Sequence, residues 1–374
     1  MRLRQQTVRL IFFGFAFVLA LTTTVSFIKI NQLIDTPVLD QPPRENRCAL
    51  LFFGLPRGYK TLVLPSIVKN VLEPNSKHGC DIYAHSVILQ KEEASRSGRG
   101  GTIDPKSIFL LEQRTQEVSA KRSGKVPHVA ITTDTEEDFW RIRNETVQKY
   151  RTTKGADGKL LYFPWARPAY IFPTSIDSMV KQWHSIETVW HLMEEESKKL
   201  QVTYDRVAML RNDVFYAAPI DIYQTSSQDA VLPGFAMYPV NDRMIYGPYS
   251  AVKIWATERF QRIDSHVRKV QPGLGMHSEW FLKESIIPAI VETGTKVVMN
   301  YDICFFRVRA DETVWISDCE RTGKNAPQGI IRDFRKVDKK RLVENIVGLP
   351  CTQSKGPYQG VMQLECRDQN QTSG

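Results

Sequence analysis

The sequence predicts an α/β fold, in which helices flank a mostly parallel β-sheet. First, Thr174 to Lys199 carries apolar residues at three- and four-residue spacing, which indicates one long amphipathic helix. Second, Val207 to Leu210 is short, apolar and bounded by charge, as a strand covered on both faces is. Third, Cys48 to Gly54 is a similar run that leads through a glycine-containing loop into a helical pattern.

The same periodicities place the other elements along the chain. Asp81 to His85 predicts a second strand, and Glu136 to Tyr150 predicts a helix. One helix is expected from Val252 to Val267, followed by last strands at Val297 to Asn300 and Cys304 to Arg309.

Two helix starts are predicted from capping residues. Thr174 with Asp177 three residues later matches a capping box at the start of the long helix. Ser278 is expected to cap a shorter helix that contains Glu279 in its first turn.

The N-terminus predicts a membrane anchor. Leu10 to Ile28 carries no charge and is nearly long enough to cross a bilayer. Arginines precede it, at Arg2, Arg4 and Arg9, so the positive-inside rule leaves the N-terminus cytoplasmic and the rest luminal, a type II topology. A cleaved signal peptide is the alternative, because small residues such as Ala20 lie near the end of the apolar run.

Composition predicts one main domain after this anchor. Hydrophobic content of 42% and charged content of 24% are ordinary for a globular protein. We expect a cytoplasmic tail at 1–9, an anchor at 10–30 and a stem at 31–46. The main domain is expected at 47–320, with an insertion at about 91–173, and a C-terminal extension follows at 321–374.

The cysteines agree with a luminal location. All 6 follow the predicted anchor, and their even number suits an oxidising compartment. They lack the spacing of a structural zinc site, and six cysteines allow 15 pairings. We expect Cys304 to pair with Cys319. The triplets at Asn144 and Asn370 are acceptor sequons for N-glycosylation, which also fits a luminal route.

A charged segment, Arg211 to Asp213, ends the predicted strand that follows the long helix. Ligands of open α/β sheets bind beyond the carboxyl ends of strands. A carboxylate there can hold a divalent cation, and a guanidinium can face phosphate. The alternative is a strand-end ion pair between Arg211 and Asp213 without a ligand.

The order of these segments resembles glycosyltransferases of the GT-A fold, a Rossmann-like α/β fold. It is most similar to the bacterial lipopolysaccharide-synthesis (WavE-like) group and related eukaryotic Golgi type II membrane proteins. The resemblance runs over roughly Ala49 to Arg307 and is firm from Gln182 to Glu279. Its motifs are Arg211-Asn212-Asp213, Asn241 to Gly247, and His277-Ser278-Glu279. This chain has Asn212-Asp213 where many such enzymes carry Asp-x-Asp.

The resemblance implies roles for three of these residues. Asp213 would hold a divalent cation, manganese or magnesium, on the diphosphate of the donor, with His277 as a further metal ligand or as a contact to the donor. Glu279 would take the proton from the acceptor hydroxyl. A carboxylate in the first turn of a helix is also favoured by the helix dipole without any function.

Five further residues are predicted to bind the donor. Arg211, Asp242 and Gly247 follow from the resemblance, although Asp242 can equally be a turn residue that bonds its own backbone. Gly54 and Arg57 lie in the loop after the first strand, which leads into a helix start of the kind that meets phosphate.

These observations predict a glycosyltransferase of the Golgi or endoplasmic reticulum membrane. It would transfer a sugar from a nucleotide sugar to a glycan, glycoprotein or glycolipid. The net charge of +9 is mild for 374 residues and does not indicate nucleic-acid binding. One alternative is a luminal sulfotransferase, because Phe53 to Thr61 loosely resembles a loop that grips the phosphate of activated sulfate. Another is a non-catalytic carbohydrate-binding protein.

Overall fold

The computed structural model describes residues 47–94, 98–121, 126–236, 239–320, 333–357 and 360–367. Glu45–Gly374 forms one compact unit. The predicted anchor and stem lie outside the described residues, as does Asn370. Within the described residues, no helix combines the length and the apolar character that a membrane crossing requires.

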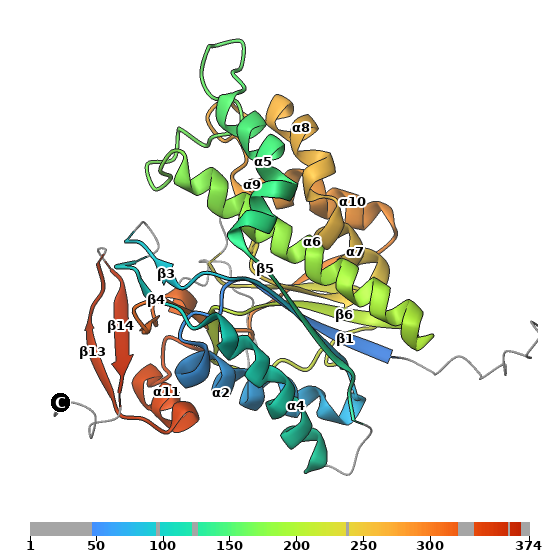
Figure 1. The fold of residues 1–374 in the computed structure, drawn as a ribbon, viewed down its shortest axis with the longest axis vertical. Helices are drawn as coiled ribbons and strands as arrows, with labels where there is room; N and C mark the ends of the chain where they lie inside the picture. Colours follow the sequence, from blue (N-terminus) through green and yellow to red (C-terminus); the bar gives the residue numbers. More distant parts are fainter. Residues whose placement is uncertain are drawn as a thin grey trace, which may run out of the picture. The chain divides into compact units, whose positions relative to one another are not determined.

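A seven-stranded sheet forms the centre of this unit, in the order β10-β8-β9-β6-β1-β2-β5 (Figure 1). Its strands pair in parallel except β9, which runs antiparallel to β6 and β8. The predicted α/β fold with a mostly parallel sheet is therefore confirmed. The strands are β1 (Arg47–Phe53), β2 (Asp81–Val87), β5 (Val129–Asp134), β6 (Tyr204–Arg211), β8 (Asp229–Pro233), β9 (Ile245–Pro248) and β10 (Lys296–Asn300).

Helices cover both faces of this sheet (Figure 1). One face carries η1 (Tyr59–Val63), α2 (Leu64–Ile67), η2 (Val68–Leu72), α3 (Glu73–Asn75), η3 (Ser76–His78), η4 (Pro105–Phe109) and α4 (Leu110–Ala120). The other carries α5 (Glu136–Thr152), α6 (Thr174–Leu200), α7 (Tyr249–Thr257), α8 (Arg259–Lys269), α9 (Ser278–Phe281), η5 (Leu282–Ile286) and α10 (Ile287–Glu292).

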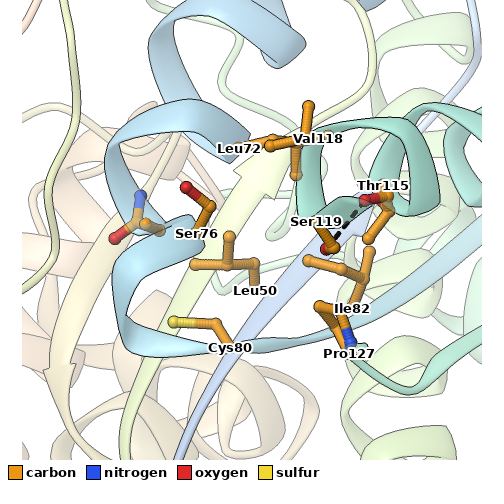
Figure 2. A pocket seen from close by; sticks show the side chains of 10 residues that line it. Leu50, Leu72, Ser76, Cys80, Ile82, Thr115, Val118, Ser119 and Pro127 are labelled. Carbon is orange, nitrogen blue, oxygen red and sulfur yellow. Dashed lines mark hydrogen bonds between the residues drawn. The ribbon is translucent and has the colours of Figure 1, made fainter. Parts of the chain in front are cut away.

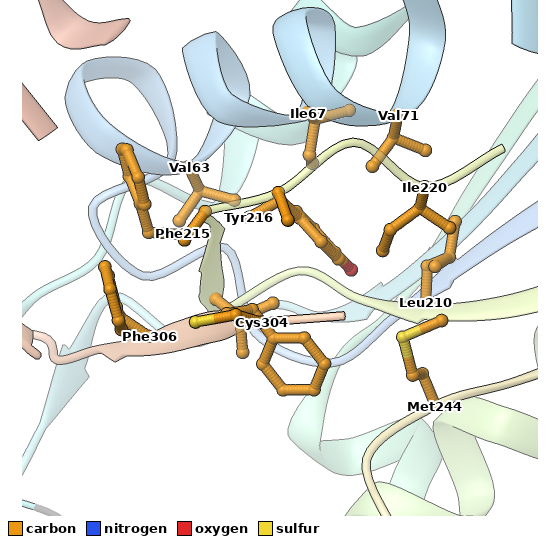
Figure 3. Close-up of a cluster of buried hydrophobic side chains, with 14 of the residues drawn as sticks. Val63, Ile67, Val71, Leu210, Phe215, Tyr216, Ile220, Met244, Cys304 and Phe306 are labelled. Atoms are coloured by element: carbon orange, nitrogen blue, oxygen red, sulfur yellow. The ribbon is translucent and has the colours of Figure 1, made fainter. Parts of the chain in front are cut away.

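Strand β1 separates two hydrophobic cores because successive side chains of a strand point to opposite faces. Leu50 and Phe52 belong to the core under η1 and α2, whereas Leu51 and Phe53 belong to the core under α6. Figure 3 shows part of the first core, where residues of the helical segment face aromatic side chains of a second sheet. The labelled members include Val63, Ile67, Val71, Phe215 and Phe306.

The second sheet is antiparallel, in the order β13-β14-β12-β11-β7. Along the chain, β7 (Val214–Tyr216) is the first of its strands. It follows β6 after only Asn212 and Asp213, so these two residues connect the two sheets. The last two strands of this sheet, β13 and β14, come from the segment that was expected to be a C-terminal extension. In the seven-stranded sheet, β5 comes from the expected insertion. The remaining elements are β7 (Val214–Tyr216), β11 (Phe305–Val308), β12 (Thr313–Trp315), η6 (Asp318–Glu320), α11 (Lys339–Val347), β13 (Cys351–Lys355), β14 (Met362–Cys366) and the hairpin of β3 (Lys91–Glu92) and β4 (Gly101–Thr102).

Three disulfides join all 6 cysteines: Cys48–Cys80, Cys304–Cys319 and Cys351–Cys366. The expected pairing of Cys304 with Cys319 is confirmed. The first bridge joins β1 to the residue before β2, and the other two lie in the second sheet region.

Both capping predictions are wrong. The N-cap of α6 is Pro173, whose side chain has no hydrogen-bonding group to cap the helix. Asp177 instead accepts hydrogen bonds from Arg151 at 2.5 and 2.9 Å. The N-cap of α9 is His277, so Ser278 is already the first helical residue. The single helix expected from Val252 to Val267 is two helices, α7 and α8, because the backbone leaves helical geometry at Glu258.

Candidate functional site

The carboxyl ends of β1 and β6 mark the topological switch point of the sheet. The chain runs from β1 to β2 and β5 on one side, and then returns to β6 on the other side of β1. Open α/β sheets bind ligands at such a point. Gly54 follows β1 with φ of 99°, a conformation that favours glycine, and its N–H donates to Ser185 Oγ at 3.0 Å.

Three predicted residues meet at this point: Arg57, Arg211 and Asp213. Arg211 binds Asp213 through two hydrogen bonds, Nε to Oδ1 at 2.7 Å and Nη2 to Oδ2 at 2.8 Å. Arg57 Nη1 also donates to Asp213 Oδ2. The other edge of Arg57 pairs with Glu92 at 2.6 and 2.7 Å. Two arginines from different strand ends therefore share one carboxylate, whose side chain is 3% exposed.

A third guanidinium, Arg309, joins this group and was not predicted as a site residue. It follows β11, is 6% exposed and stacks on the Trp315 ring at 4.0 Å. Its Nε has no hydrogen-bond partner, and among the described residues no carboxylate pairs with it. Burial and the nearby Arg307 and Arg57 lower the pKa of Arg309 well below its ordinary value. We call Arg57, Arg211, Arg309, Asp213 and Glu92 the arginine cluster.

The electrostatics of the arginine cluster keep Asp213 ionised. Burial opposes its ionisation, but Arg211 and then Arg57 lower the pKa of this carboxyl far below its usual range. Conversely, Asp213 outweighs burial and raises the pKa of Arg211. Three guanidiniums face two carboxylates, so the cluster retains unneutralised positive charge, which favours an anionic ligand.

The same geometry bears on the metal role expected for Asp213. Both of its oxygens accept from guanidiniums, an arrangement that does not fit a divalent cation at this carboxylate. Its assignment as a metal ligand stays a prediction, and we assign no chemical step to a metal there.

Two other residues predicted to bind the sugar donor, Asp242 and Gly247, lie before and within β9, the strand that pairs with β6. Asp242 is partly exposed and close enough to Arg211 to contribute to its raised pKa. Gly247 lies inside β9, where an added Cβ would come within 2.8 Å of Ala230 Cα and of the Asp229 carbonyl oxygen. Close packing of β9 on β8 is therefore a sufficient reason for glycine at position 247.

The predicted base and metal partner come together at the start of α9. His277 Nδ1 lies 3.2 Å from Glu279 Oε2, and the His277 ring is 5.4 Å from that of Tyr170. Both side chains are largely buried, with 10% and 18% exposed. The roles of Glu279 as base and His277 as metal ligand stay predictions.

A second polar cluster, His85, Asp134 and His184, lies one strand further along the same edge. Asp134 Oδ2 is 3.1 Å from His85 Nε2 and 2.7 Å from His184 Nε2. The three residues come from β2, β5 and α6. No sequence motif indicates this group, since about 50 residues separate Asp134 from each histidine. The only local signal was His85 at the end of a predicted strand.

The pocket drawn in Figure 2 belongs to neither cluster. It lies beside the Cys48–Cys80 bridge, and Cys80 directly precedes β2, so it is at the amino end of that strand. Apolar residues supply much of its lining, including Leu50, Leu72 and Val118, and none of the described residues that line it has an ionisable side chain.

Comparison with known proteins does not assign the chain to a family. No family model and no curated protein matches it. Among solved structures, it is similar to the glycosyltransferase GlyE of Streptococcus pneumoniae TIGR4, with a TM-score of 0.29 and 10% sequence identity. The match covers 68% of this chain and 46% of that one, less than half of its length. A likeness this slight assigns neither fold nor function.

Proposed function

We propose that the protein is a glycosyltransferase that binds the diphosphate of a nucleotide sugar at the arginine cluster. The observation that carries the proposal is the set of three guanidiniums at the switch point of the sheet, one of them buried without a carboxylate partner among the described residues. Guanidiniums match phosphate oxygens through paired hydrogen bonds, and a diphosphate would supply the missing negative charge.

The cluster can also promote the reaction. In sugar transfer, the acceptor oxygen bonds to the anomeric carbon while the bond from that carbon to the diphosphate oxygen breaks. Negative charge then grows on the leaving diphosphate, and fixed cations in a buried site stabilise it. Under this proposal Glu279 accepts the proton of the acceptor hydroxyl.

Location and acceptor belong to the same proposal. A type II anchor at residues 10–30 would hold the enzyme in the Golgi or endoplasmic reticulum membrane, with a luminal glycan, glycoprotein or glycolipid as acceptor. The three disulfides support an oxidising compartment.

Nucleotide binding by the full-length protein in detergent tests the proposal. We expect calorimetry to detect a nucleoside diphosphate, and Arg211→Gln to weaken that binding about 10- to 100-fold, because one charged hydrogen-bonding group is lost. Arg335→Gln is the matched control: Arg335 also binds an aspartate two residues away, Asp333, but its side chain is 62% exposed. Absence of nucleotide binding, or equal affinity in Arg211→Gln, would contradict the proposal.

Turnover assays separate the alternatives. Incubation with a panel of nucleotide sugars should give sugar transfer that Glu279→Gln strongly reduces. Transfer of sulfate alone, from an activated sulfate donor, would identify a sulfotransferase. Glycan binding without any nucleotide binding would identify a non-catalytic carbohydrate-binding protein.

A further inference from the structure

A buried histidine pair around one carboxylate stands beside the arginine cluster but takes no part in it. His85 is fully buried, the His184 side chain is 3% exposed, and the Asp134 side chain is 20% exposed. One ligand atom of each residue lies within 4.8 Å of the other two. In a tetrahedral site with metal bonds of about 2 Å, ligand atoms are roughly 3.3 Å apart. The two measured distances to Asp134, 3.1 and 2.7 Å, are close to that spacing.

We propose that His85, Asp134 and His184 bind one divalent transition-metal ion, with zinc as the best match. Two imidazole nitrogens and one carboxylate oxygen suit zinc and its neighbours, whereas magnesium and calcium prefer oxygen ligands. Three protein ligands leave a fourth position open, and the partial exposure of Asp134 places that position on the solvent side.

The surroundings of His85 fit this role. Its Nδ1 is 2.8 Å from Ser185 Oγ, which also accepts from the Gly54 N–H at 3.0 Å and can donate to the His85 carbonyl at 3.3 Å. In the structure Nδ1 can accept from Ser185 Oγ while Nε2 donates to Asp134. With the ion bound, Ser185 Oγ donates to the His85 carbonyl instead, Nδ1 carries the ring proton, and Nε2 presents its lone pair to the site. Such a hydrogen bond to the second nitrogen is what orients a metal-binding imidazole.

His184 must change one contact to bind the ion. In the structure Arg143 Nε donates to His184 Nδ1 at 3.3 Å, so His184 Nε2 holds the proton and donates to Asp134. Metal binding at Nε2 moves this proton to Nδ1, which can then no longer accept from Arg143, so the 3.3 Å contact with Arg143 opens. Arg143 keeps its ion pair with Glu187 and its position 4.0 Å from the Phe260 ring.

The alternative is a hydrogen-bond network in which Asp134 only accepts from two imidazoles. His184→Gln separates the two, because the glutamine amide can still donate to Asp134 but is a poor zinc ligand. Asp134→Asn removes the anionic ligand. His191→Gln is the matched control: it lies on the same helix, its side chain is 55% exposed, and it is 3.5 Å from Glu194.

Calorimetry with zinc chloride on the full-length protein, stripped with EDTA, gives the test. We expect one zinc ion per chain, with affinity at least about 100-fold lower in His184→Gln and Asp134→Asn and unchanged in His191→Gln. No saturable zinc binding by the wild type would overturn the proposal. Wild-type affinity in His184→Gln would do so equally.

A second measurement needs no variant. Cobalt can replace zinc as a spectroscopic probe, and we expect the intense visible absorption of four-coordinate cobalt when it is added to the stripped wild-type protein. The weak spectrum of six-coordinate cobalt would contradict the assignment even if a variant failed to fold. The inference does not rest on the proposed sugar transfer, since neither readout involves a donor or an acceptor.

Discussion

Two aspartates lie at the carboxyl edge of one sheet and differ in the basic side chains around them. Asp213 follows β6 and lies between Arg57 and Arg211. Asp134 ends β5 and lies between His85 and His184. Both have a lowered pKa. At Asp213 the charge of Arg211 outweighs burial, and at Asp134 the hydrogen bond from His85 is the main cause.

The partners decide what each aspartate can do. A guanidinium is always charged and has no lone pair, so the group around Asp213 can only attract an anion. An imidazole can be neutral and offers a lone pair, so the group around Asp134 can accept a cation. The same residue type at equivalent strand ends therefore supports opposite ligand chemistry.

The largest loss of stability is expected when the Asp213 carboxylate, which pairs with two arginines, is removed. Asp213→Asn strands buried guanidiniums, and we expect the free energy of unfolding to fall on the order of 3 kcal/mol. Urea denaturation followed by circular dichroism measures it. Asp205→Asn, an exposed change on the same β6 strand, is the control and should cost under about 0.5 kcal/mol.

A nearly unchanged stability of Asp213→Asn, with loss of divalent-dependent nucleotide binding, would reverse the comparison. Asp213 would then act as a metal ligand, as the sequence resemblance implied, and the arginines would not depend on it.

A smaller effect is expected at the histidine group. For Asp134→Asn at pH 7 in EDTA, we expect a loss of about 1–2 kcal/mol, because both imidazoles can stay neutral and no obligatory charge is stranded. Urea denaturation under the conditions used for Asp213→Asn allows direct comparison. A loss as large as that of Asp213→Asn would show that the two groups do not differ as we describe.

The smallest effect is a pH dependence. The hydrogen bond from His85, followed by that from His184, lowers the pKa of Asp134 from 3.8 to about 2. Because the folded pKa is depressed, the carboxylate stabilises the fold above about pH 4, and this contribution is lost as pH falls toward 2. With solvent screening it amounts to about 1 kcal/mol. The stability gap between wild type and Asp134→Asn, measured in EDTA, should therefore close between pH 4 and 2; a constant gap would contradict this account.

The sequence by itself determined the local elements of the α/β fold. The apolar run after Arg47 became β1, and the three- and four-residue spacing after Thr174 became the 27-residue helix α6. It also placed Arg211 and Asp213 at a strand end, because that segment is contiguous in the chain. Such patterns reflect burial of one or two faces by residues a few positions apart, which a single sequence records. The capping box predicted at Thr174 is absent, because Asp177 pairs with Arg151 from another helix.

Only the tertiary structure decided which distant residues meet. Parallel strands bring their carboxyl ends to one edge, so Arg57 reaches Asp213 across 156 residues, and His85, Asp134 and His184 converge from three elements. Arg309 joins through the second sheet, in which β11 pairs with β7 and with β12. Periodicity records which side of an element is buried, but it does not record which other element covers that side. The packing of elements on one another is what assembles the arginine cluster and the group of His85, Asp134 and His184.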